Sequence, residues 1–126
     1  MNISVAGVAE RDGKYLVALR KPGTSIGERW EFPGGKLESG ETPEDALIRE
    51  YIEELGVSIT VNERLCEGEF SNGQKDYHLI AYKIEITDDN FTTPEHQKII
   101  WADLTELGRL DFPASDMIIV DYILSA

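Results

Sequence analysis

The stretch TPEDALIREYIEELG, residues 42–56, restricts the fold more than any other part of the sequence. Thr42 is a typical helix N-cap, Pro43 is favoured in the first helical turn, and Gly56 is a typical helix stop, so the stretch predicts a helix from residue 42 to about residue 55. At about 100° of rotation per residue, the apolar side chains share one arc of this helix, which therefore needs another element to cover it. That arc holds Leu47, Ile48, Tyr51, Ile52 and Leu55, and the opposite side holds Arg49, Glu50, Glu53 and Glu54.

The polar side of this helix carries an unusual concentration of negative charge. Glu50, Glu53 and Glu54 stand at i, i+3 and i+4, where like charges repel by roughly 0.2–0.5 kcal/mol per pair. The preceding segment PGGKLESGE, predicted as a turn-rich loop, contains three glycines, which allow the backbone to approach a ligand closely. Loop carbonyls and helix carboxylates together are the oxygen ligands that Mg²⁺ prefers. The pattern favours a shared cation, and a solvated acidic face is the alternative interpretation.

The remaining pattern alternates strands and helices irregularly. Residues 3–9 and 14–21 read as a hairpin across RDGK, and residues 57–70 and 76–86 as a longer hairpin across SNGQ. WEF is a short strand-like piece, 98–104 is a further strand, and 111–125 is a C-terminal helix with Pro113 near its start. The chain is long enough for one ordinary domain, so we expect a single α/β domain over residues 1–126, with a mixed sheet flanked by helices.

Composition excludes several classes of function. A net charge of −12 disfavours binding to a nucleic-acid polymer or to an anionic membrane. No apolar run approaches the roughly 20 residues that a membrane span needs, and the N-terminus lacks the basic region of a signal peptide. Cys66 is the only cysteine, which rules out an intrachain disulfide and suits a reducing compartment. We therefore expect a cytoplasmic protein, either a monomer or a homodimer.

The glycine loop and the acidic helix together resemble a known signature. Gly35, Glu41, Arg49–Glu50, Ile52–Leu55 and Gly56–Val57 stand at the spacings of the Nudix box of Nudix hydrolases. One slot departs mildly, because Tyr51 occupies a position that is usually aliphatic; its place in the apolar arc predicts that it is tolerated. WEFPGGKLESGETPEDALIRE and the later FPASD resemble the MutT-like branch. The resemblance covers nearly the whole chain and implies the Nudix fold, an α/β/α sandwich around a mixed β-sheet.

The resemblance also implies a chemistry, the hydrolysis of a nucleoside diphosphate linked to another group by water and divalent metal ions. Mg²⁺ is the expected ion and Mn²⁺ a possible substitute. Glu50, Glu53, Glu54 and the Gly34 carbonyl are implied metal ligands. Arg49 would hold the carboxylates in place, and Glu41 would contact the metal ligands without binding the metal itself. The general base stays open among Glu50, Glu53 and Glu95, the last from outside the box.

Residues outside the box bear on the substrate. Arg20 matches a phosphate-binding arginine of MutT-like proteins, or is a surface charge at a strand end. Phe32 lines a base pocket or packs in the core. Asp116 matches a base-reading position, where a carboxylate suits the exocyclic amine of cytosine, or is an acidic residue favoured at a helix N-terminus. Trp30 is expected in the core, and His78 on a strand and His96 in a loop are expected to be structural or solvated.

These features favour a small nucleotide as the substrate. Sequence markers of hydrolases for ADP-ribose, dinucleoside polyphosphates and coenzyme A are missing from the chain. The first expectation is (d)CTP or a modified pyrimidine form, cleaved to the monophosphate and pyrophosphate. The alternatives are an oxidised guanine triphosphate such as 8-oxo-dGTP, another nucleoside diphosphate derivative, and a Nudix domain that binds nucleotide without catalysis.

Overall fold

The computed structural model describes residues 2–23, 28–92 and 96–126. Its strands are β1 (Asn2–Arg11), β2 (Lys14–Arg20), β3 (Trp30–Glu31), β4 (Gly34–Lys36), β5 (Ile59–Asn72), β6 (Lys75–Ile86) and β7 (His96–Ala102). Its helices are α1 (Pro43–Leu55), α2 (Leu104–Leu107) and α3 (Ala114–Ser125). Within these described ranges, no helix has the length and apolar character needed to cross a membrane.

Both predicted hairpins are confirmed, and each depends on residues that tolerate a left-handed backbone. Asp12 and Gly13 have φ values of 54° and 76° between β1 and β2, as a tight hairpin turn requires. Gly73 has a φ of 65° between β5 and β6, a hairpin that is a little longer than predicted. The residues of the two turns therefore determine where the β1–β2 and β5–β6 hairpins reverse direction.

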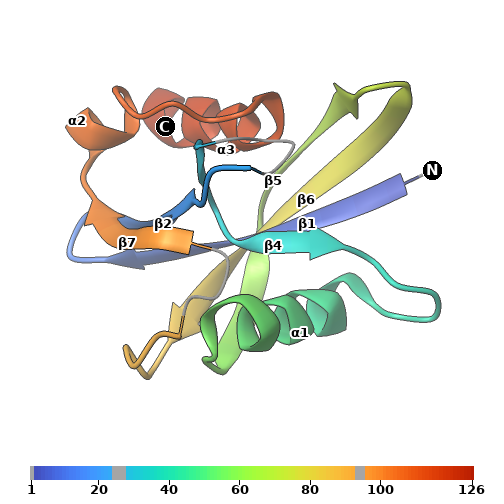
Figure 1. Ribbon diagram of the computed structural model, residues 1–126, viewed down its shortest axis with the longest axis horizontal. Helices are drawn as coiled ribbons and strands as arrows, with labels where there is room; N and C mark the ends of the chain where they lie inside the picture. Colours follow the sequence, from blue (N-terminus) through green and yellow to red (C-terminus); the bar gives the residue numbers. More distant parts are fainter. Residues whose placement is uncertain (1, 24–27, 93–95) are drawn as a thin grey trace.

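β1 is the central strand of a mixed sheet. It pairs in parallel with β6, from Asn2 opposite Tyr77 to Ala9 opposite Ile84, and antiparallel with β4 and with the start of β2. β5 continues the sheet beyond β6, while β3 and β7 both pair with β2. The short strand β4, which leads into α1, therefore pairs with β1 at the centre of the sheet (Figure 1).

Helices cover the two faces of this sheet, as expected for an α/β/α sandwich (Figure 1). Alternate residues of β1 supply the two cores: Val5 and Ala9 pack in the cluster that includes α1, whereas Ala6 and Val8 pack in the cluster that includes α3. This alternation follows from the two-residue period of a strand. Gly7 therefore lies on the α1 side of β1.

Three local expectations were wrong. Residues 34–36, expected in a loop, form β4, because Gly34 and Gly35 pair closely with β1. The short helix α2 was not expected, although Asp103 and Glu106 form its capping box. His96 lies at the start of β7 and is only 2% exposed, so the expected loop position is also wrong.

The rotation of α1 about its axis also differs from the expectation. Ile52, placed in the apolar arc, is 53% exposed, whereas Glu54, placed on the polar side, is 8% exposed. The buried residues of the helix are Ala46, Leu47, Tyr51, Glu54 and Leu55. The buried arc is therefore turned by roughly 60° towards the carboxylates. α1 thus presents part of its acidic side to the interior of the protein.

Candidate active site

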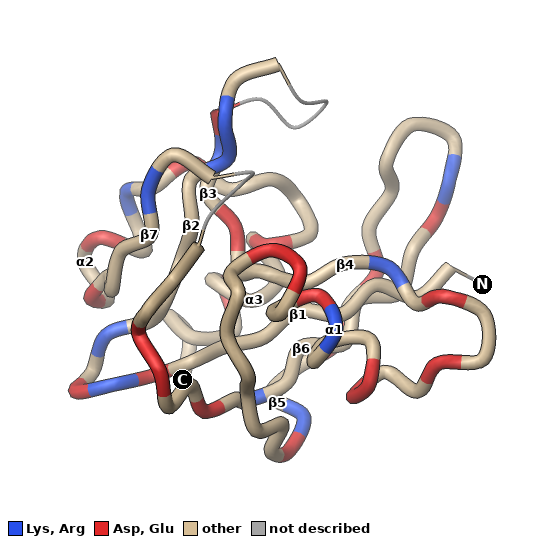
Figure 2. Tube along the Cα trace, turned by 60° about the horizontal axis from the view of Figure 1, so that its bottom comes forward, with Lys and Arg blue, Asp and Glu red and all other residues tan. Residues whose placement is uncertain are grey.

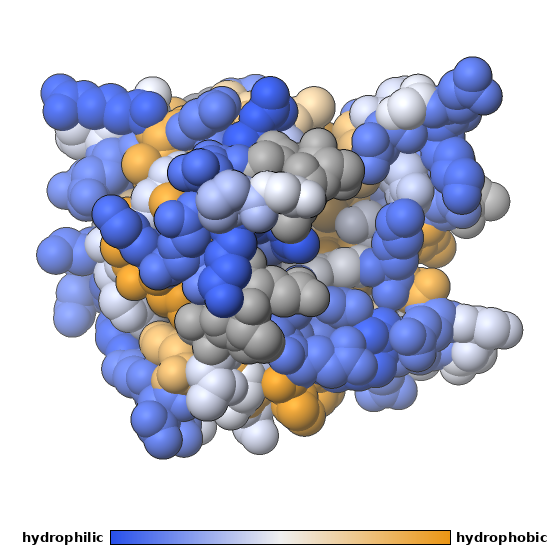
Figure 3. All heavy atoms as spheres, viewed as in Figure 1, coloured by the Kyte–Doolittle hydropathy of each residue, from blue (hydrophilic) through white to orange (hydrophobic). Residues whose placement is uncertain are grey.

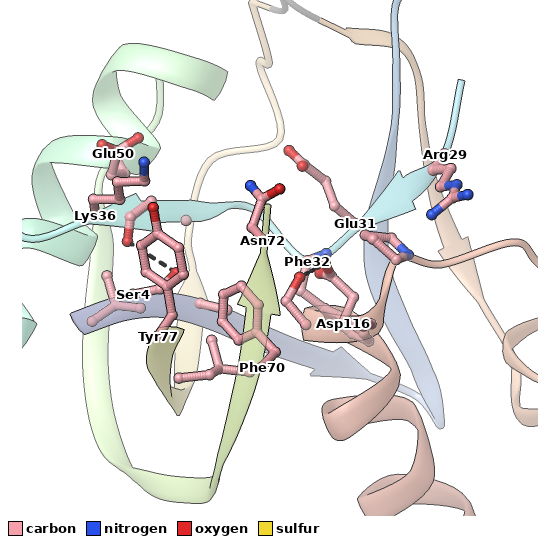
Figure 4. Close-up of a pocket in the computed structure, with 18 of the residues that line it drawn as sticks. Ser4, Arg29, Glu31, Phe32, Lys36, Glu50, Phe70, Asn72, Tyr77 and Asp116 are labelled. Atoms are coloured by element: carbon pink, nitrogen blue, oxygen red, sulfur yellow. Dashed lines mark hydrogen bonds between the residues drawn. The ribbon is translucent and has the colours of Figure 1, made fainter. Parts of the chain in front are cut away.

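A pocket of about 470 Å³ opens between α1, the sheet and the start of α3. Figure 3 shows a recess near the middle of one face, with hydrophilic residues along its rim. In the close-up, Glu50 and Lys36 lie at one end, Asp116 and Phe32 at the other, and Phe70 and Tyr77 between them (Figure 4). The pocket is lined by Ser4–Ala6, Arg20, Arg29, Glu31, Phe32, Gly34–Lys36, Glu50, Glu54, Phe70–Asn72, Tyr77, Leu79 and Pro113–Asp116.

One end of the pocket combines two carboxylates with a glycine backbone. Glu50 packs so closely on β4 that a Cβ atom at Gly35 would come within 2.5 Å of its carboxyl carbon. Burial raises the pKa of Glu50, in spite of the opposing hydrogen bond from Arg49. Glu54, one helical turn further along α1, is also buried, and its Oε1 lies 4.0 Å from a guanidinium nitrogen of Arg20. Two partly desolvated carboxylates thus face the pocket.

Gly35→Ala tests whether this close packing matters for the reaction. The added methyl group displaces the flexible end of Glu50 rather than backbone, so we expect the melting temperature to fall by no more than about 4 °C, or roughly 1 kcal/mol. Turnover should fall by at least about 100-fold, the scale of a misplaced catalytic group. Thermal melts and steady-state rates check both parts. Gly34→Ala is the contrast, since its methyl group would meet the Val5 carbonyl, and it should unfold the protein.

Arg49 links the helix to the loop that precedes it. Its guanidinium donates to Glu41 at 2.7 and 3.0 Å, to Glu50 at 2.9 Å, to Glu53 at 3.1 Å and to the Lys36 carbonyl at 3.2 Å. The hydrogen bond from Arg49 lowers the pKa of Glu41, and the same contact raises that of Arg49. Acidic residues are concentrated on α1 and on the loop before it (Figure 2). The guanidinium of Arg49 forms ion pairs with four of these carboxylates.

The oxygen donors of this end fit a hard divalent cation. Within the described residues, no three His, Cys, Asp or Glu side chains converge on one point. Glu53 is 58% exposed at its side chain, is bound to Arg49 and is not part of the pocket wall, unlike Glu50 and Glu54. Mg²⁺ is commonly held by one or two carboxylates, with waters and substrate phosphates completing its shell. Glu50, Glu54 and the Gly34 backbone all line the pocket and supply oxygen donors of this kind.

Three strands bring a buried polar network to the pocket edge. The carboxylate of Glu31 accepts hydrogen bonds from Arg20 at 3.1 and 3.2 Å, and it lies 2.9 Å from Nε2 of the buried His96. Arg20 and His96 are cross-strand partners on β2 and β7, and Glu31 is on β3. Arg20 therefore lines the pocket rather than the outer surface. Neither Glu31 nor His96 was predicted as part of the site. The sequence feature that could have indicated Glu31 is its position as a charged residue between two aromatic residues in WEF.

Asp116 closes the opposite end of the pocket. Its Oδ1 accepts the Phe32 backbone N–H at 2.8 Å, and its Oδ2 accepts the Ser115 hydroxyl at 2.9 Å. Burial, together with the charge of Glu31, raises the pKa of Asp116 to about 7. The side chain of Phe32 stacks on Phe112 at 5.7 Å between centroids and also lines the pocket, so both interpretations of Phe32 hold. Asp116 thus ties α3 to the segment between β3 and β4 instead of capping its own helix.

The raised pKa of Asp116 predicts a pH-dependent stability. The folded protein keeps this proton where the unfolded chain releases it, so the stabilisation is full below about pH 4 and is lost as the pH rises towards about 7. Asp116→Asn removes the titration while keeping an acceptor for Phe32. Relative to wild type, its free energy of unfolding should rise by about 2.5 kcal/mol between about pH 5 and about pH 8. Urea unfolding at both pH values checks this; a constant difference contradicts it, and Asp121→Asn on the exposed side of α3 is the control.

Aromatic side chains of the β5–β6 hairpin form the wall between the two ends. Phe70 and Tyr77 stack with centroids 5.2 Å apart, and Nζ of Lys36 lies 5.1 Å from the Tyr77 ring. Asn72, near the hairpin turn, also lines the pocket. None of these residues was predicted as part of the site. The feature of the sequence that could have indicated them is an aromatic residue on each strand close to the SNGQ turn.

Two further sequence predictions concern Tyr51 and Glu95. Tyr51 is fully buried, as predicted. Burial, and then the negative charges of Glu54, Glu31 and Asp116, raise its pKa, so its hydroxyl remains a donor. Glu95, the candidate base from outside the box, lies outside the described residues.

Comparison with known proteins agrees with this geometry. The model of the NUDIX domain family matches residues 1–121. The chain is 31% identical to the CTP pyrophosphohydrolase of Escherichia coli over 96% of this chain and 90% of that protein. It is 30% identical to an 8-oxo-dGTP diphosphatase of Haemophilus influenzae over 95% and 89% of the two chains. The solution structure of the E. coli ORF135 protein superposes with a TM-score of 0.84 at 31% identity, over 99% and 89% of the chains. This protein therefore belongs to the Nudix family, as a MutT-like Nudix hydrolase.

Proposed function

We propose that this Nudix hydrolase cleaves nucleoside triphosphates to the monophosphate and pyrophosphate with Mg²⁺, and that (d)CTP or a modified pyrimidine form is its preferred substrate. One observation carries the proposal: a single pocket joins a carboxylate and glycine end to an aromatic wall and a buried carboxyl group. Its volume of about 470 Å³ suits a nucleotide, and its two ends differ as phosphate and base differ.

The phosphate end provides groups for both the metal and the substrate. Glu50, Glu54 and the Gly34 carbonyl would hold the cation, with Glu53 able to join them or to orient a water molecule. A bound divalent cation neutralises phosphate oxygens and lowers the pKa of water. Arg49 keeps the carboxylates of the helix in fixed positions through its hydrogen bonds. These contacts limit the reorganisation needed when substrate binds.

Basic residues of the pocket would bind the phosphates directly. Arg20, Arg29 and Lys36 line it, although the chain as a whole carries a charge of −12. Glu31 fixes the guanidinium of Arg20 from the side of β3. We assign the general base to Glu50, Glu53 or Glu95. Glu50 is the member of this set that lines the pocket in the part of the chain described.

The other end of the pocket would recognise the base. Phe32, Phe70 and Tyr77 offer flat apolar surfaces for a nucleobase. An ionised Asp116 accepts hydrogen bonds, which matches the exocyclic amine of cytosine. The relative named CTP pyrophosphohydrolase supports this choice.

An oxidised guanine triphosphate is the second candidate, and the pKa of Asp116 is the observation that favours it. With a pKa of about 7, a large fraction of Asp116 is protonated at neutral pH and can donate to a purine carbonyl. The relative named 8-oxo-dGTP diphosphatase supports this alternative. We further propose that the enzyme acts on free nucleotides in the cytoplasm, in keeping with its charge and its single cysteine.

A panel of nucleotides tests the proposal. CTP, dCTP, 5-methyl-dCTP, GTP, dGTP and 8-oxo-dGTP, with ADP-ribose as a comparison, would be incubated with the protein and Mg²⁺, and the products separated by ion-exchange chromatography. We expect monophosphate plus pyrophosphate, with the highest kcat/KM for a cytidine nucleotide. Preferential cleavage of ADP-ribose, or release of inorganic phosphate in place of pyrophosphate, would overturn the proposal.

Metal binding should also stabilise the free protein. A cation that binds only the folded state stabilises it by mass action, and at ten times its Kd it contributes about 1.4 kcal/mol. Repulsion between Glu50 and Glu54 is relieved at the same time. We expect millimolar Mg²⁺ to raise the melting temperature by about 3–6 °C relative to EDTA. A K⁺ salt at matched ionic strength is the control, and equal melting curves in Mg²⁺ and EDTA would contradict a metal site formed without substrate.

A further inference from the structure

Tyr51 is the one residue that departs from the usual pattern of the Nudix box, and its side chain reaches across the core to the central strand. Its ring is fully buried, and its hydroxyl donates to the Gly7 carbonyl at 3.1 Å. Tyr51 follows Glu50 directly and stands one helical turn before Glu54 and Leu55 on α1. The hydroxyl therefore fixes α1 at the turn that carries both pocket carboxylates.

The central strand offers a matching space for this ring. A Cβ atom at Gly7 would lie 2.7 Å from the hydroxyl oxygen of Tyr51 and 2.8 Å from its Cε1. Val5 and Ala9, on either side of Gly7 on the same face, pack in the core cluster with Tyr51. Only a glycine at this point leaves room for the ring and brings its hydroxyl to the strand backbone.

The contact continues from Gly7 to the glycine loop of the site. The Gly7 N–H donates to the Pro33 carbonyl at 3.0 Å, and Pro33 directly precedes Gly34. Two hydrogen bonds on one residue of β1 thus connect α1, which carries Glu50, with the backbone beside Gly34. Arg49 joins the same two elements at their solvent side through the Lys36 carbonyl. Tyr51 provides the connection from inside the core.

We propose that Tyr51, together with Gly7, is a positioning residue that sets the distance between the carboxylates of α1 and the Gly34 carbonyl. This inference rests on the proposed metal ligands and goes beyond them, because Tyr51 itself touches neither metal nor substrate. An aliphatic residue at position 51 packs against the core but has no donor for Gly7. The connection across β1 is therefore a feature of this chain and not of the box in general.

Tyr51→Phe removes the hydroxyl and keeps the ring, and Mn²⁺ alone is a direct probe of the site. We expect the Kd for Mn²⁺, measured from the free-ion EPR signal, to rise by on the order of 10-fold, the effect typical of residues that support metal ligands. We also expect Tyr51→Phe to hydrolyse nucleotide more slowly than wild type at limiting metal concentration. Saturating metal should largely restore its turnover, because the ligands are displaced and not removed. Amide signals of Gly34 and Gly35 should shift in ¹H–¹⁵N spectra.

Tyr82→Phe is the matched control, since Tyr82 is a buried tyrosine of the same core cluster that lies on β6. We expect it to leave the Kd for Mn²⁺ unchanged, because the hydroxyl of Tyr82 makes no hydrogen bond to Gly7 or the glycine loop in the part of the chain described. If wild type binds Mn²⁺ and Tyr51→Phe binds it within about twofold, Tyr51 is only a packing residue and the inference is wrong. If wild type binds no Mn²⁺, the proposed metal site fails and the inference with it. If Tyr51→Phe loses its dispersed spectrum, the hydroxyl stabilises the whole fold and not the metal ligands in particular, and the inference is wrong.

Discussion

Glu54→Gln is expected to lower turnover by at least about 100-fold for every nucleotide that the wild type hydrolyses. The substitution preserves the shape of a side chain that is 8% exposed and faces the pocket, but it removes the charge that would bind the cation. Losing one key electrostatic group typically costs two to three decades in rate. The fold should survive, because Gln can occupy the same space beside Arg20.

Steady-state rates and thermal melts together check this prediction. Glu44→Gln is the matched control: it makes the same change on the same helix, at an exposed position in the first turn. It should leave kcat unchanged, and both variants should melt within about 4 °C of wild type. Wild-type turnover by folded Glu54→Gln would remove Glu54 from the proposed metal site. A large drop in turnover caused by Glu44→Gln would show that any loss of negative charge from α1 lowers turnover, whether or not the residue lines the pocket.

The second large effect is expected at Asp116. Asp116→Ala should lower kcat/KM for the preferred nucleotide by roughly 5- to 150-fold, equivalent to about 1–3 kcal/mol for a lost hydrogen-bonded group. Poor substrates should lose less, because they do not use this group. The phosphate end should remain intact, since Asp116 lies at the opposite end of the pocket from Glu50 (Figure 4).

Asp116→Asn gives the sharper comparison, because an amide keeps the shape and gains donors. The preference should move away from cytosine and towards a base that offers acceptors. The decisive quantity is the ratio of kcat/KM between CTP and 8-oxo-dGTP for wild type, Asp116→Ala and Asp116→Asn. A constant ratio with falling activity would make Asp116 a structural tie to Phe32 and nothing more. Asp121→Asn, on the exposed side of the same helix, should change neither value.

Local patterns in the sequence were sufficient for the elements and for the family. The RDGK turn predicted the β1–β2 hairpin, and Thr42, Pro43 and Gly56 predicted both ends of α1. The fixed spacing from Gly35 to Val57 predicted the Nudix family, which the comparison with known proteins confirms. Turns, caps and motif spacings depend on near neighbours along the chain, so they can be read without knowing the tertiary contacts.

The rotation of α1 could not be read in the same way. Hydrophobic periodicity placed Ile52 inside and Glu54 outside, and both assignments were wrong. Periodicity assumes that apolar residues alone mark the buried side of a helix. Here the helix also borders a pocket, and the side chains of Glu50 and Glu54 line that pocket instead of the outer surface. The periodicity of the helix is therefore least reliable at the residues that we propose as metal ligands.

The sequence by itself determined the α/β class, the boundaries of α1, the two hairpins and the presence of a Nudix box. Only the tertiary structure decided that Arg20, Glu31 and His96 share one network, and that Asp116 binds the Phe32 backbone from 84 positions away in the chain. The physical reason is that such contacts depend on strand register and on which face of the sheet each element covers. A residue's neighbours in sequence fix neither, and the burial that raises the pKa of Asp116 arises only when distant elements pack together.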